Sequence, residues 1–435
     1  MAIPTLTGID SALSGIEAAQ VELDTTSNNI DNESTTGYSE EVVNLSESTP
    51  LTIPSATNAD GASTQLGTGV DVGSVTRQRN TFLDAQYRAQ NTQLGSYTQQ
   101  ATDLGDAQTL LNEPSTDAIS GQLQTFWSDW NSVANDPSSL SAQQALVGDA
   151  GTLSQTINNV YSGLQQVQSE ASAQYTSLTA APSSGNSTGG ELYQDATKIA
   201  SLNTSIKQAL AAGQSPNTLE DERDSALDDL STLGNITVTQ QNDGSVTVNF
   251  GDASNPLVSG GTVDWPQTIT SATGGELGAL LDASSSTGTI GGYMSSLSSI
   301  ASDLSSTVNG LSTGFFGSAS GSQIIGNPAV SAGSVDTTNA GQVANLQGGT
   351  VDQTYDQLVT QVGDDVSSAQ SSQTTSQAIV TAFSDQRDSV SGVSEEQEMA
   401  NLISEQRGYQ ASAQTLSTLS SVLGTLISQV GGAGL

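Results

Sequence analysis

Apolar residues recur every seven positions at both ends of the chain. Near the amino end they are Leu6, Ile9, Leu13, Ile16, Leu23 and Ile30. Near the carboxyl end they are Leu402, Tyr409, Leu416, Leu423 and Val430. A seven-residue period is typical of a helix whose narrow apolar stripe packs along a partner helix. The pattern therefore predicts one long helix at each end, with a single apolar stripe on each.

Neither stripe can be buried by its own helix. The most economical arrangement pairs the first 30 residues with the last 35 as an antiparallel coiled coil, which places the two termini side by side. We expect the stripe residues to serve in subunit packing as well. The alternative is that each terminal helix packs separately on a globular domain.

Helical spacing of apolar residues predicts further helices in the interior. Their approximate ranges are 83–111, 119–133, 146–178, 294–311 and 355–383. Pro114 should end the first of them because proline cannot continue a helix. The second carries Phe126, Trp127 and Trp130, which we interpret as core residues rather than a ligand platform. Together these helices predict an elongated bundle.

One segment has the two-residue period of β-strands. Ile236 and Val238 alternate with threonines, Asn242-Asp243-Gly244 supplies a turn, and alternation resumes from Val246 to Phe250. This order of signals predicts a β-hairpin. We place it in a small mixed β domain at residues 220–288.

The predicted fold is mainly α: an elongated helical bundle with paired terminal coiled-coil helices and a small β-containing outer domain. Residues 1–45 with 392–435 would form the axial core domain, 46–219 with 289–391 the bundle, and 220–288 the outer domain. Low composition complexity predicts linkers at 182–190, 283–292 and 317–341. A polar stretch at 46–69 is expected to separate the first helix from the bundle.

Charge and composition exclude several classes of function. The 435 residues include 8 Lys and Arg against 45 Asp and Glu, a net charge of −37, which opposes nucleic acid and anionic membranes. Because Cys and His are absent, we expect no disulfide, no His- or Cys-based catalysis, and no metal or cofactor. Adjacent carboxylates such as Asp228-Asp229 point in different directions and are interpreted as solvated faces. We expect no enzyme activity, no cleavable secretory signal and no membrane span.

The few basic residues could serve one of two roles. Arg77, Arg79 and Arg88 lie close together in the sequence, whereas the other five are scattered. In so acidic a chain, we expect each to have a carboxylate partner within the same subunit. The alternative hypothesis is that these three arginines contact an acidic neighbouring subunit.

The two ends also carry recognisable motifs. Residues 27–39 read SNNIDNESTTGYS and residues 399–427 read MANLISEQRGYQASAQTLSTLSSVLGTLI. The first strongly resembles the signature of bacterial flagellar rod, hook and hook-associated proteins, and the second resembles their matching terminal motif. From this resemblance we assign Asn28, Asn29, Gly37 and Tyr38 to a motif that sets the exit from the first helix. Glu40 and Glu41 follow where the family commonly has a basic residue.

The interior narrows the resemblance. The segments RQRNTFLDAQYRAQ (77–90), FWSDWNSVANDPSSLSAQQALV (126–147), LEDERDSALDDLSTL (219–233) and GGELGALLD (274–282) resemble, in order, the family of flagellar hook-associated protein 1. TYDQLVTQVGDDV (354–366) and SGVSEEQEMANLI (391–403) continue the match. The resemblance covers nearly the whole chain.

Membership of that family would imply a structural protein of the bacterial flagellum that joins hook to filament. The implied partners are copies of the same chain in a ring, the hook protein, the second junction protein (hook-associated protein 3) and a cytoplasmic export chaperone on the carboxyl helix. The implied location is outside the cell, after export by the flagellar type III apparatus. The alternatives are a hook or distal rod protein, or a flagellum-associated wall hydrolase that uses carboxylates alone.

Overall fold

The computed structural model describes residues 3–54, 63–183, 186–251 and 255–432, except the side chains of 3–6, 53–54, 63–64 and 430–432. The helices in this part are α1 (Ile3–Asn32), α2 (Thr81–Leu111), α3 (Ile119–Asn135), α4 (Leu140–Leu178), α5 (Glu191–Ala211), α6 (Asn217–Leu233), η1 (Ser271–Thr273), α7 (Gly275–Ser284), α8 (Thr289–Leu311), α9 (Ala340–Ala344), α10 (Thr350–Ser391) and α11 (Glu395–Gly432). The strands are β1 (Glu41–Glu47), β2 (Leu51–Pro54), β3 (Ser63–Leu66), β4 (Val70–Arg77), β5 (Ile236–Gln240), β6 (Val246–Phe250), β7 (Val258–Ser259) and β8 (Thr262–Val263).

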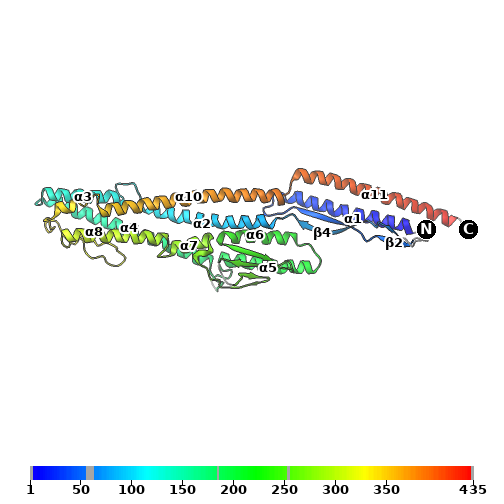
Figure 1. The fold of residues 1–435 in the computed structure, drawn as a ribbon, viewed down its shortest axis with the longest axis horizontal. Helices are drawn as coiled ribbons and strands as arrows, with labels where there is room; N and C mark the ends of the chain where they lie inside the picture. The colour runs from blue at the N-terminus through cyan, green and yellow to red at the C-terminus, as the bar shows by residue number, and fades with distance from the viewer. Residues whose placement is uncertain (1–2, 55–62, 184–185, 252–254, 433–435) are drawn as a thin grey trace.

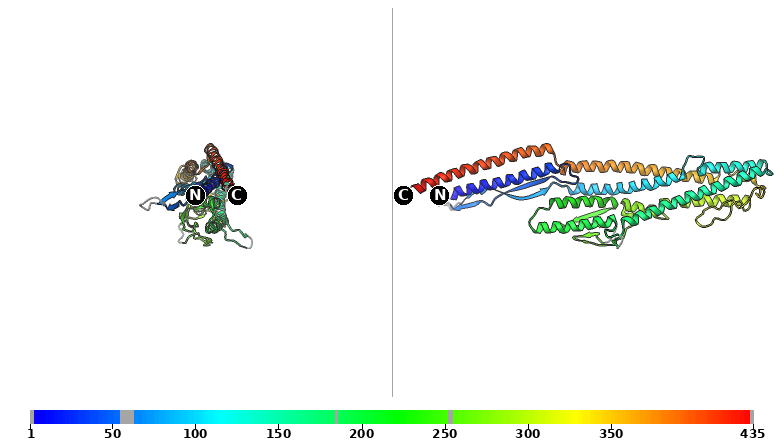
Figure 2. Two further views of the ribbon diagram at one scale, coloured as in Figure 1. Left: turned by 90° about the vertical axis from the view of Figure 1, so that its right-hand side faces the viewer. Right: turned by 180° about the vertical axis from the view of Figure 1, so that it is seen from behind.

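The molecule is long and narrow (Figures 1 and 2). Helices α1 and α11 lie side by side at one end and run in opposite directions, so that both termini lie at that end. Helices α2 and α10 continue along the middle, and α3, α4 and α8 form the opposite end. The prediction of a mainly α, elongated fold with paired terminal helices is therefore confirmed. In the described part, no helix is both long and apolar enough to span a bilayer.

A two-stranded ribbon runs beside α1. Strand β1 pairs antiparallel with β4, and the register shifts between Asn44 and Leu45. Strands β2 and β3 pair with each other beyond it. The backbone N–H of Val70 donates to Ser14 Oγ at 3.3 Å, which fixes the ribbon to α1. The stretch 46–69, predicted to separate the first helix from the bundle, lies between α1 and α2 in the chain, and its described residues include β2, β3 and the end of β1.

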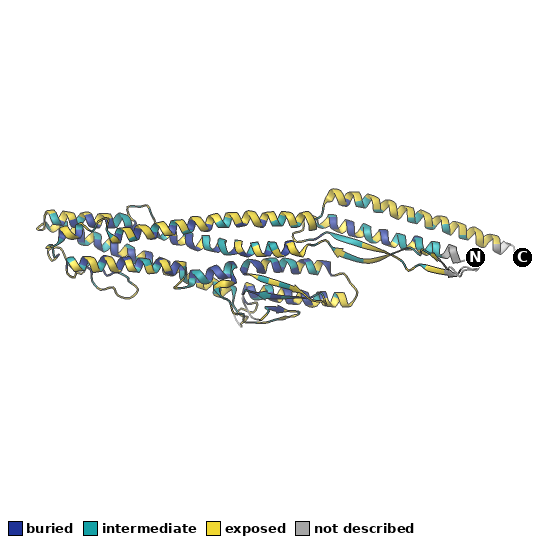
Figure 3. Ribbon diagram, in the orientation of Figure 1, coloured by how far each residue is buried: buried dark blue, intermediate teal, exposed yellow. Residues whose placement is uncertain are grey.

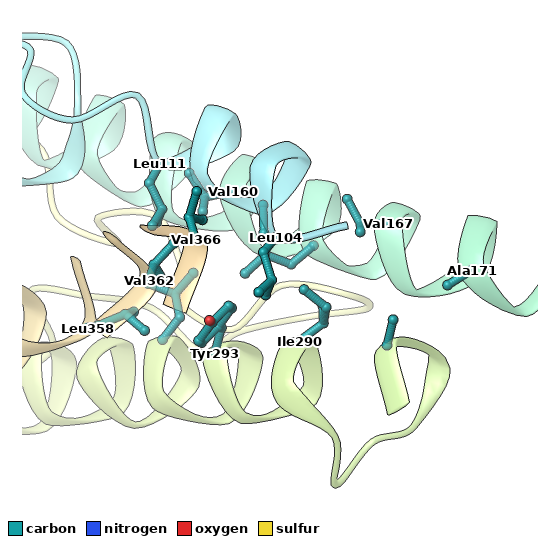
Figure 4. Close-up of a cluster of buried hydrophobic side chains, with 14 of the residues drawn as sticks. Leu104, Leu111, Val160, Val167, Ala171, Ile290, Tyr293, Leu358, Val362 and Val366 are labelled. Atoms are coloured by element: carbon teal, nitrogen blue, oxygen red, sulfur yellow. The ribbon is translucent and has the colours of Figure 1, made fainter. Parts of the chain in front are cut away.

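The bundle core is formed where four long helices meet (Figure 4). Helix α2 contributes Leu104 and Leu111, and α8 contributes Tyr293 from the facing side. Helix α10 adds Leu358 and Val362, and α4 adds side chains from Val160 onward. The Tyr293 hydroxyl donates to Asp365 at 2.7 Å, so the polar end of this buried ring is satisfied. The predicted helices over these segments are confirmed.

The end of the bundle farthest from the termini is closed by aromatic side chains. Phe126, Trp127 and Trp130 are at most 1% exposed, and Trp130 packs on Phe315 with ring centroids 5.0 Å apart. Their interpretation as core residues is confirmed. The segment 317–341, predicted as a linker, instead packs against this end and buries Ile325. The low complexity of this segment does not reveal that it packs, because a few apolar residues among Gly and Ser are enough to cover the end of the bundle.

The small sheet has the order β5-β6-β7-β8 and lies along one side of the molecule with α5 and α6. Ile236 pairs with Phe250, and Gly244 in the turn has φ of 82°, a conformation that glycine adopts without strain. The predicted hairpin is confirmed. Helix α5 was not predicted from the sequence, although Leu192, Ala196 and Ile199 on its buried face have helical spacing.

Candidate functional site

Small residues of α1 lie against α11. A Cβ atom on Gly8 would lie 3.3 Å from Leu419 Cδ1, and one on Gly15 would lie 3.1 Å from Ser412 Oγ. Ala12 lies between these glycines on the same face and is buried. A Cβ atom at either glycine would therefore make a tight contact, and Leu419 or Ser412 would have to shift to accept it. Gly8, Ala12 and Gly15 follow one another at steps of four and three residues. This spacing of small residues is the sequence pattern that could have predicted the contact.

The large residues of the predicted stripes flank that contact. Seven of them are half-buried: Ile9, Ile16, Leu23, Ile30, Leu402, Leu416 and Leu423. Leu13 remains 45% exposed and Tyr409 38% exposed. The side chains of Leu6 and Val430 lie outside the described residues. In a single chain, the apolar edges of the helix pair are thus only partly covered.

Helix α11 exposes further apolar side chains away from α1 (Figure 3). They are Met399, Ile403, Val422, Leu426 and Ile427. Ile427 is 65% exposed. The exposed side of α1 carries a second seven-residue row, formed by the acidic residues Asp10, Glu17, Asp24 and Asp31. The helix pair therefore presents an apolar surface on α11 and an acidic row on α1.

Asn29 connects the end of α1 to two other segments. Its Nδ2 donates to the Glu41 carbonyl at 3.0 Å and to Glu398 Oε2 at 3.2 Å. Its Oδ1 accepts hydrogen bonds from the Tyr38 hydroxyl at 2.8 Å and from the Glu41 N–H at 3.0 Å. Asn29 and Glu398 are each 2% exposed, so this side-chain amide satisfies several buried polar groups at once.

The other positions of the helix-exit motif surround Asn29. Asn28 donates from Nδ2 to the Tyr38 hydroxyl at 3.1 Å. Gly37 has φ of +84°, which a residue with a side chain adopts only with strain. The four residues assigned to the motif therefore lie together at the turn that leads from α1 into β1. Glu398, which lies against this turn, was not anticipated because its position on α11 is far away in the sequence.

A buried ion network links the terminal ribbon to the bundle. Arg77 on β4 pairs with Glu220 and Asp224 at 3.0 Å and also with Asp221. Arg88 on α2 pairs with Asp228 at 2.7 Å. The paired side chains are only 10–20% exposed.

Two further arginines complete the network. Arg79 pairs with Asp84 at 2.8 Å, and Arg387 on α10 pairs with Asp228 at 2.8 Å. Burial opposes ionisation of Asp224, but Arg79, Arg88 and Arg77 hold the pKa of its carboxyl below the ordinary range. The network therefore fastens β4, α2, α6 and α10 together.

This geometry decides between the two roles of the arginines. Arg77, Arg79 and Arg88 all have carboxylate partners in the same chain, as expected, and the hypothesis that they contact a neighbouring subunit is not needed. The interpretation of Asp228 as part of a solvated face is wrong, because its side chain is 17% exposed and shared by two arginines. The arginines and their carboxylate partners lie far apart in the sequence. For this reason the periodic pattern of residues could not predict the ion network.

Carboxyl groups also lie along the interface of the terminal helices. Burial raises the pKa of Glu22 on α1 and, with repulsion from Glu22 and Glu398, that of Glu405 on α11. Glu405 Oε1 accepts a hydrogen bond from Thr26 at 3.1 Å, while Oε2 is buried with no partner among the described residues. Burial and repulsion by Glu41 raise the pKa of Tyr38 above its ordinary value. Protonation of these carboxyl groups at low pH therefore reduces the electrostatic repulsion within the helix pair.

The chain is thus a mainly α, elongated protein whose first and last helices pair and leave apolar edges exposed. Comparison with known proteins agrees with this class. The family model described as the flagellar hook-associated protein FlgK helical domain matches residues 104–321, half of the chain. The chain therefore belongs to the FlgK family of flagellar hook-associated proteins.

Two further family models match the ends. The model of the flagellar basal body rod protein covers residues 9–38, and that of the FlgEFG protein carboxyl terminus covers residues 385–429. These ranges include most of the paired helices α1 and α11. The ends of the chain thus match models of rod proteins, whereas residues 104–321 match the FlgK helical domain.

Individual relatives carry the same name. Flagellar hook-associated protein 1 of Bacillus subtilis is 32% identical over 240 residues, which cover 55% of this chain and 45% of the relative. The protein of that name from Escherichia coli is 28% identical over 256 residues, 58% of this chain and 43% of the relative. The solved hook junction protein FlgK from Burkholderia pseudomallei is 24% identical with a TM-score of 0.41, covering 52% of this chain and 43% of that one. The chain thus spans about half the length of the curated relatives it matches.

Proposed function

We propose that this chain is a structural component of the bacterial flagellum, an adaptor between hook and filament that catalyses no reaction. The observation that carries the proposal is the incompletely covered helix pair, on which Leu13, Tyr409 and Ile427 remain exposed. Burial of such side chains in an assembly gains about 25 cal/mol per Å² of apolar surface. Neighbouring copies in a ring would supply the missing cover, with the hook protein and the second junction protein as the axial partners.

Family membership supports a junction role over a hook or distal rod role. The rod-protein models match only residues 9–38 and 385–429, whereas residues 104–321 between them match the model of the FlgK helical domain. We propose that residues 1–45 with 392–435 are the axial core domain, 46–219 with 289–391 the bundle domain, and 220–288 the outer domain. We also propose that the chain is exported by the flagellar type III apparatus and that a cytoplasmic chaperone binds α11 before export.

The test is a substitution on the exposed face of α11. Ile427→Asp should leave the single chain folded, because this side chain is 65% exposed, and should prevent the joining of hook to filament. The matched control is Leu140→Asp at the start of α4, where the side chain is 62% exposed but lies at the opposite end of the molecule. Motility, and electron microscopy of detached hooks, provide the readout. Normal filaments on cells carrying Ile427→Asp would overturn the assignment of α11.

A deletion strain separates the alternatives. Loss of a junction protein leaves hooks without filaments, whereas loss of a hook or distal rod protein leaves no hook. A wall hydrolase would release fragments from purified peptidoglycan and would lose that activity on substitution of a single Asp or Glu. Hooks without filaments, together with no release of fragments, are the expected results.

A further inference from the structure

The two edges of the small sheet differ in how well they are protected from pairing with another strand. The strand order β5-β6-β7-β8 makes β5 and β8 the outer strands. Strand β8 is only two residues long and is followed by Asp264 and Pro266. Shortness, charge and proline all protect a sheet edge from pairing. Strand β5 has none of these features, because its five residues read ITVTQ.

The backbone groups of β5 alternate in direction. The Asn235 carbonyl accepts a hydrogen bond from the Gly251 N–H at 2.7 Å. The Gln241 N–H donates to the Ser245 carbonyl at 2.8 Å, so the odd-numbered residues face β6. The even-numbered residues between them point their N–H and C=O groups away from β6. They are Ile236, Val238 and Gln240. Among the described residues, these backbone groups have no hydrogen-bond partner, so β5 presents a free pairing edge.

A groove runs along this free edge. A cavity of about 540 Å³ is lined by the same three β5 residues and, across from them, by α2. The exposed α2 residues of the lining are Thr81, Ala85 and Ala89, all of them small. A five-residue strand is about 17 Å long, which is the length of edge available for pairing. The groove therefore has an unpaired strand on one side and a helix without bulky exposed side chains on the other.

The charges around the groove indicate what kind of segment it would accept. The arginines of the ion network that line it are already paired with carboxylates. Burial lowers the pKa of Arg223, and the charges of Asp224 and Glu220 oppose that shift. The lining therefore favours uncharged side chains. The chain as a whole carries a net charge of −37, which repels a second copy and attracts a basic protein.

We propose that the groove binds an extended segment of a basic partner protein, which pairs with β5 as a fifth strand of the sheet. In this mode of recognition, main-chain hydrogen bonds give affinity and alternate side chains give specificity. Ile236 and Val238 lie opposite the buried Phe250 and Val248, so every second residue of the added segment would face the apolar side. The segment should therefore alternate apolar and uncharged polar residues between basic flanks. The site lies away from the terminal helix pair and does not depend on the role at the hook–filament junction.

Isothermal titration calorimetry of the full chain with a synthetic peptide tests the proposal. The peptide acetyl-Lys-Thr-Val-Thr-Val-Thr-Lys-amide should bind with one-to-one stoichiometry. The same peptide with Glu in place of both Lys residues should bind at least about tenfold more weakly at low salt, because the acidic chain repels it. Equal binding of the two peptides, or no binding of the Lys peptide at millimolar concentration, would overturn the proposal.

A proline on the strand edge locates the binding. Val238→Pro removes a free N–H from the groove side and keeps the N–H groups that pair with β6, and proline is tolerated on an edge strand. It should weaken binding of the Lys peptide at least about tenfold. Val263→Pro on β8 is the matched control. The Asp264 N–H donates to the Leu257 carbonyl at 2.9 Å, so the backbone groups of Val263 point away from β7 on the opposite edge of the sheet. An equal loss of binding in the two variants would contradict pairing with β5.

A second variant fills the groove from the helix side and leaves the sheet unchanged. Ala89→Trp should weaken binding of the Lys peptide at least about tenfold, whereas Ala378→Trp on the exposed side of α10 should not. Binding that survives both Val238→Pro and Ala89→Trp would overturn the assignment of the groove. Gel filtration of the chain alone tests the other occupant. A dimer that Val238→Pro dissociates would place a second copy in the groove and would overturn the assignment to a basic partner.

Discussion

Asn29 on α1 donates a hydrogen bond to Glu398 on α11 at 3.2 Å, although 369 residues separate them in the chain. The same side chain accepts hydrogen bonds from Tyr38 and from the backbone of Glu41. One amide therefore fixes the end of the first helix, the turn after it and the start of the last helix. The geometry of the whole helix pair depends on this point, because α1 and α11 diverge from the bundle here.

Replacement of Asn29 tests that dependence. Asn29→Ala removes the donor to the buried Glu398 Oε2 and the acceptor of the Tyr38 hydroxyl, which should cost about 2–3 kcal/mol. Hydrogen exchange should show faster opening of α1 and α11, with little change in the bundle. Gln20→Ala on the exposed side of α1 is the matched control. Unchanged exchange in Asn29→Ala would mean that apolar contacts alone hold the pair.

The small residues between the helices give a second prediction. Gly15→Leu should force α11 away from α1, because even a Cβ atom at this position lies 3.1 Å from Ser412 Oγ. Overpacking of this kind costs about 1–3 kcal/mol. Gly408→Leu on α11 is the control, since no atom lies within 4 Å of a Cβ there. Hydrogen exchange of α11 should rise only in Gly15→Leu, and equal effects of the two substitutions would contradict the close approach.

Sequence reasoning found the long helices because their stripes face partners over their whole length. It missed the β1–β4 ribbon because burial does not alternate along its strands: β1 is half-buried over its first three residues and exposed from Asn44 onward, and Leu45 and Val72 are exposed. It missed α5 because Ala196 and other small residues weaken the stripe. It treated 317–341 as a linker because isolated residues such as Ile325 carry no period.

The candidate site was only partly accessible to the same reasoning. Periodicity selects large apolar residues, and it therefore identified the flanks of the helix pair rather than Gly8 and Gly15 between the helices. The motif that contains Asn29 and Tyr38 was visible as a resemblance. Its partner Glu398 was not, because a hydrogen bond between distant segments leaves no local pattern.

The buried ion network should contribute far more to stability than exposed ion pairs do. Asp228→Asn removes the carboxylate shared by Arg88 and Arg387 and leaves two buried cations short of a partner, which should cost about 2–4 kcal/mol. Lys207→Met breaks the pair with Asp243, whose side chains are 62% and 41% exposed, and should leave the unfolding free energy almost unchanged, because solvent screens an exposed ion pair. Denaturant titration measures both. A similar loss in the two variants would show that the network is not specifically stabilising.

Stability should fall between pH 5 and pH 8. Burial raises the pKa of Asp195 to about 7 and that of Asp103 to about 6, and burial with a neighbouring Asp149 raises that of Asp129 to about 7. A carboxyl group whose pKa is raised by folding stabilises the native state fully below its ordinary pKa, and this contribution is lost as the pH rises through the folded value. Asp224 acts in the opposite sense, since its lowered pKa gives stability that is lost only in acid. Melting temperatures should therefore peak on the acidic side of neutrality, and a maximum at pH 8 would contradict this account.

Asp195 offers the sharpest test of that pH dependence. Its Oδ2 is buried with no partner among the described residues, and Glu191 and Asp229 repel its charge. Asp195→Asn keeps the shape and removes the charge, so it should stabilise the chain at pH 8 by about 1 kcal/mol, which is about 1 °C in melting temperature for a chain of 435 residues. At pH 5 the native carboxyl is already protonated whereas the unfolded one is ionised, so the gain should be clearly smaller than at pH 8, and it should vanish only below the ordinary carboxyl pKa. Asp303→Asn on the exposed side of α8 should shift the melting temperature at neither pH. If Asp195→Asn were equally stabilising at pH 5 and pH 8, the gain would come from packing or helix propensity rather than from relief of a buried charge.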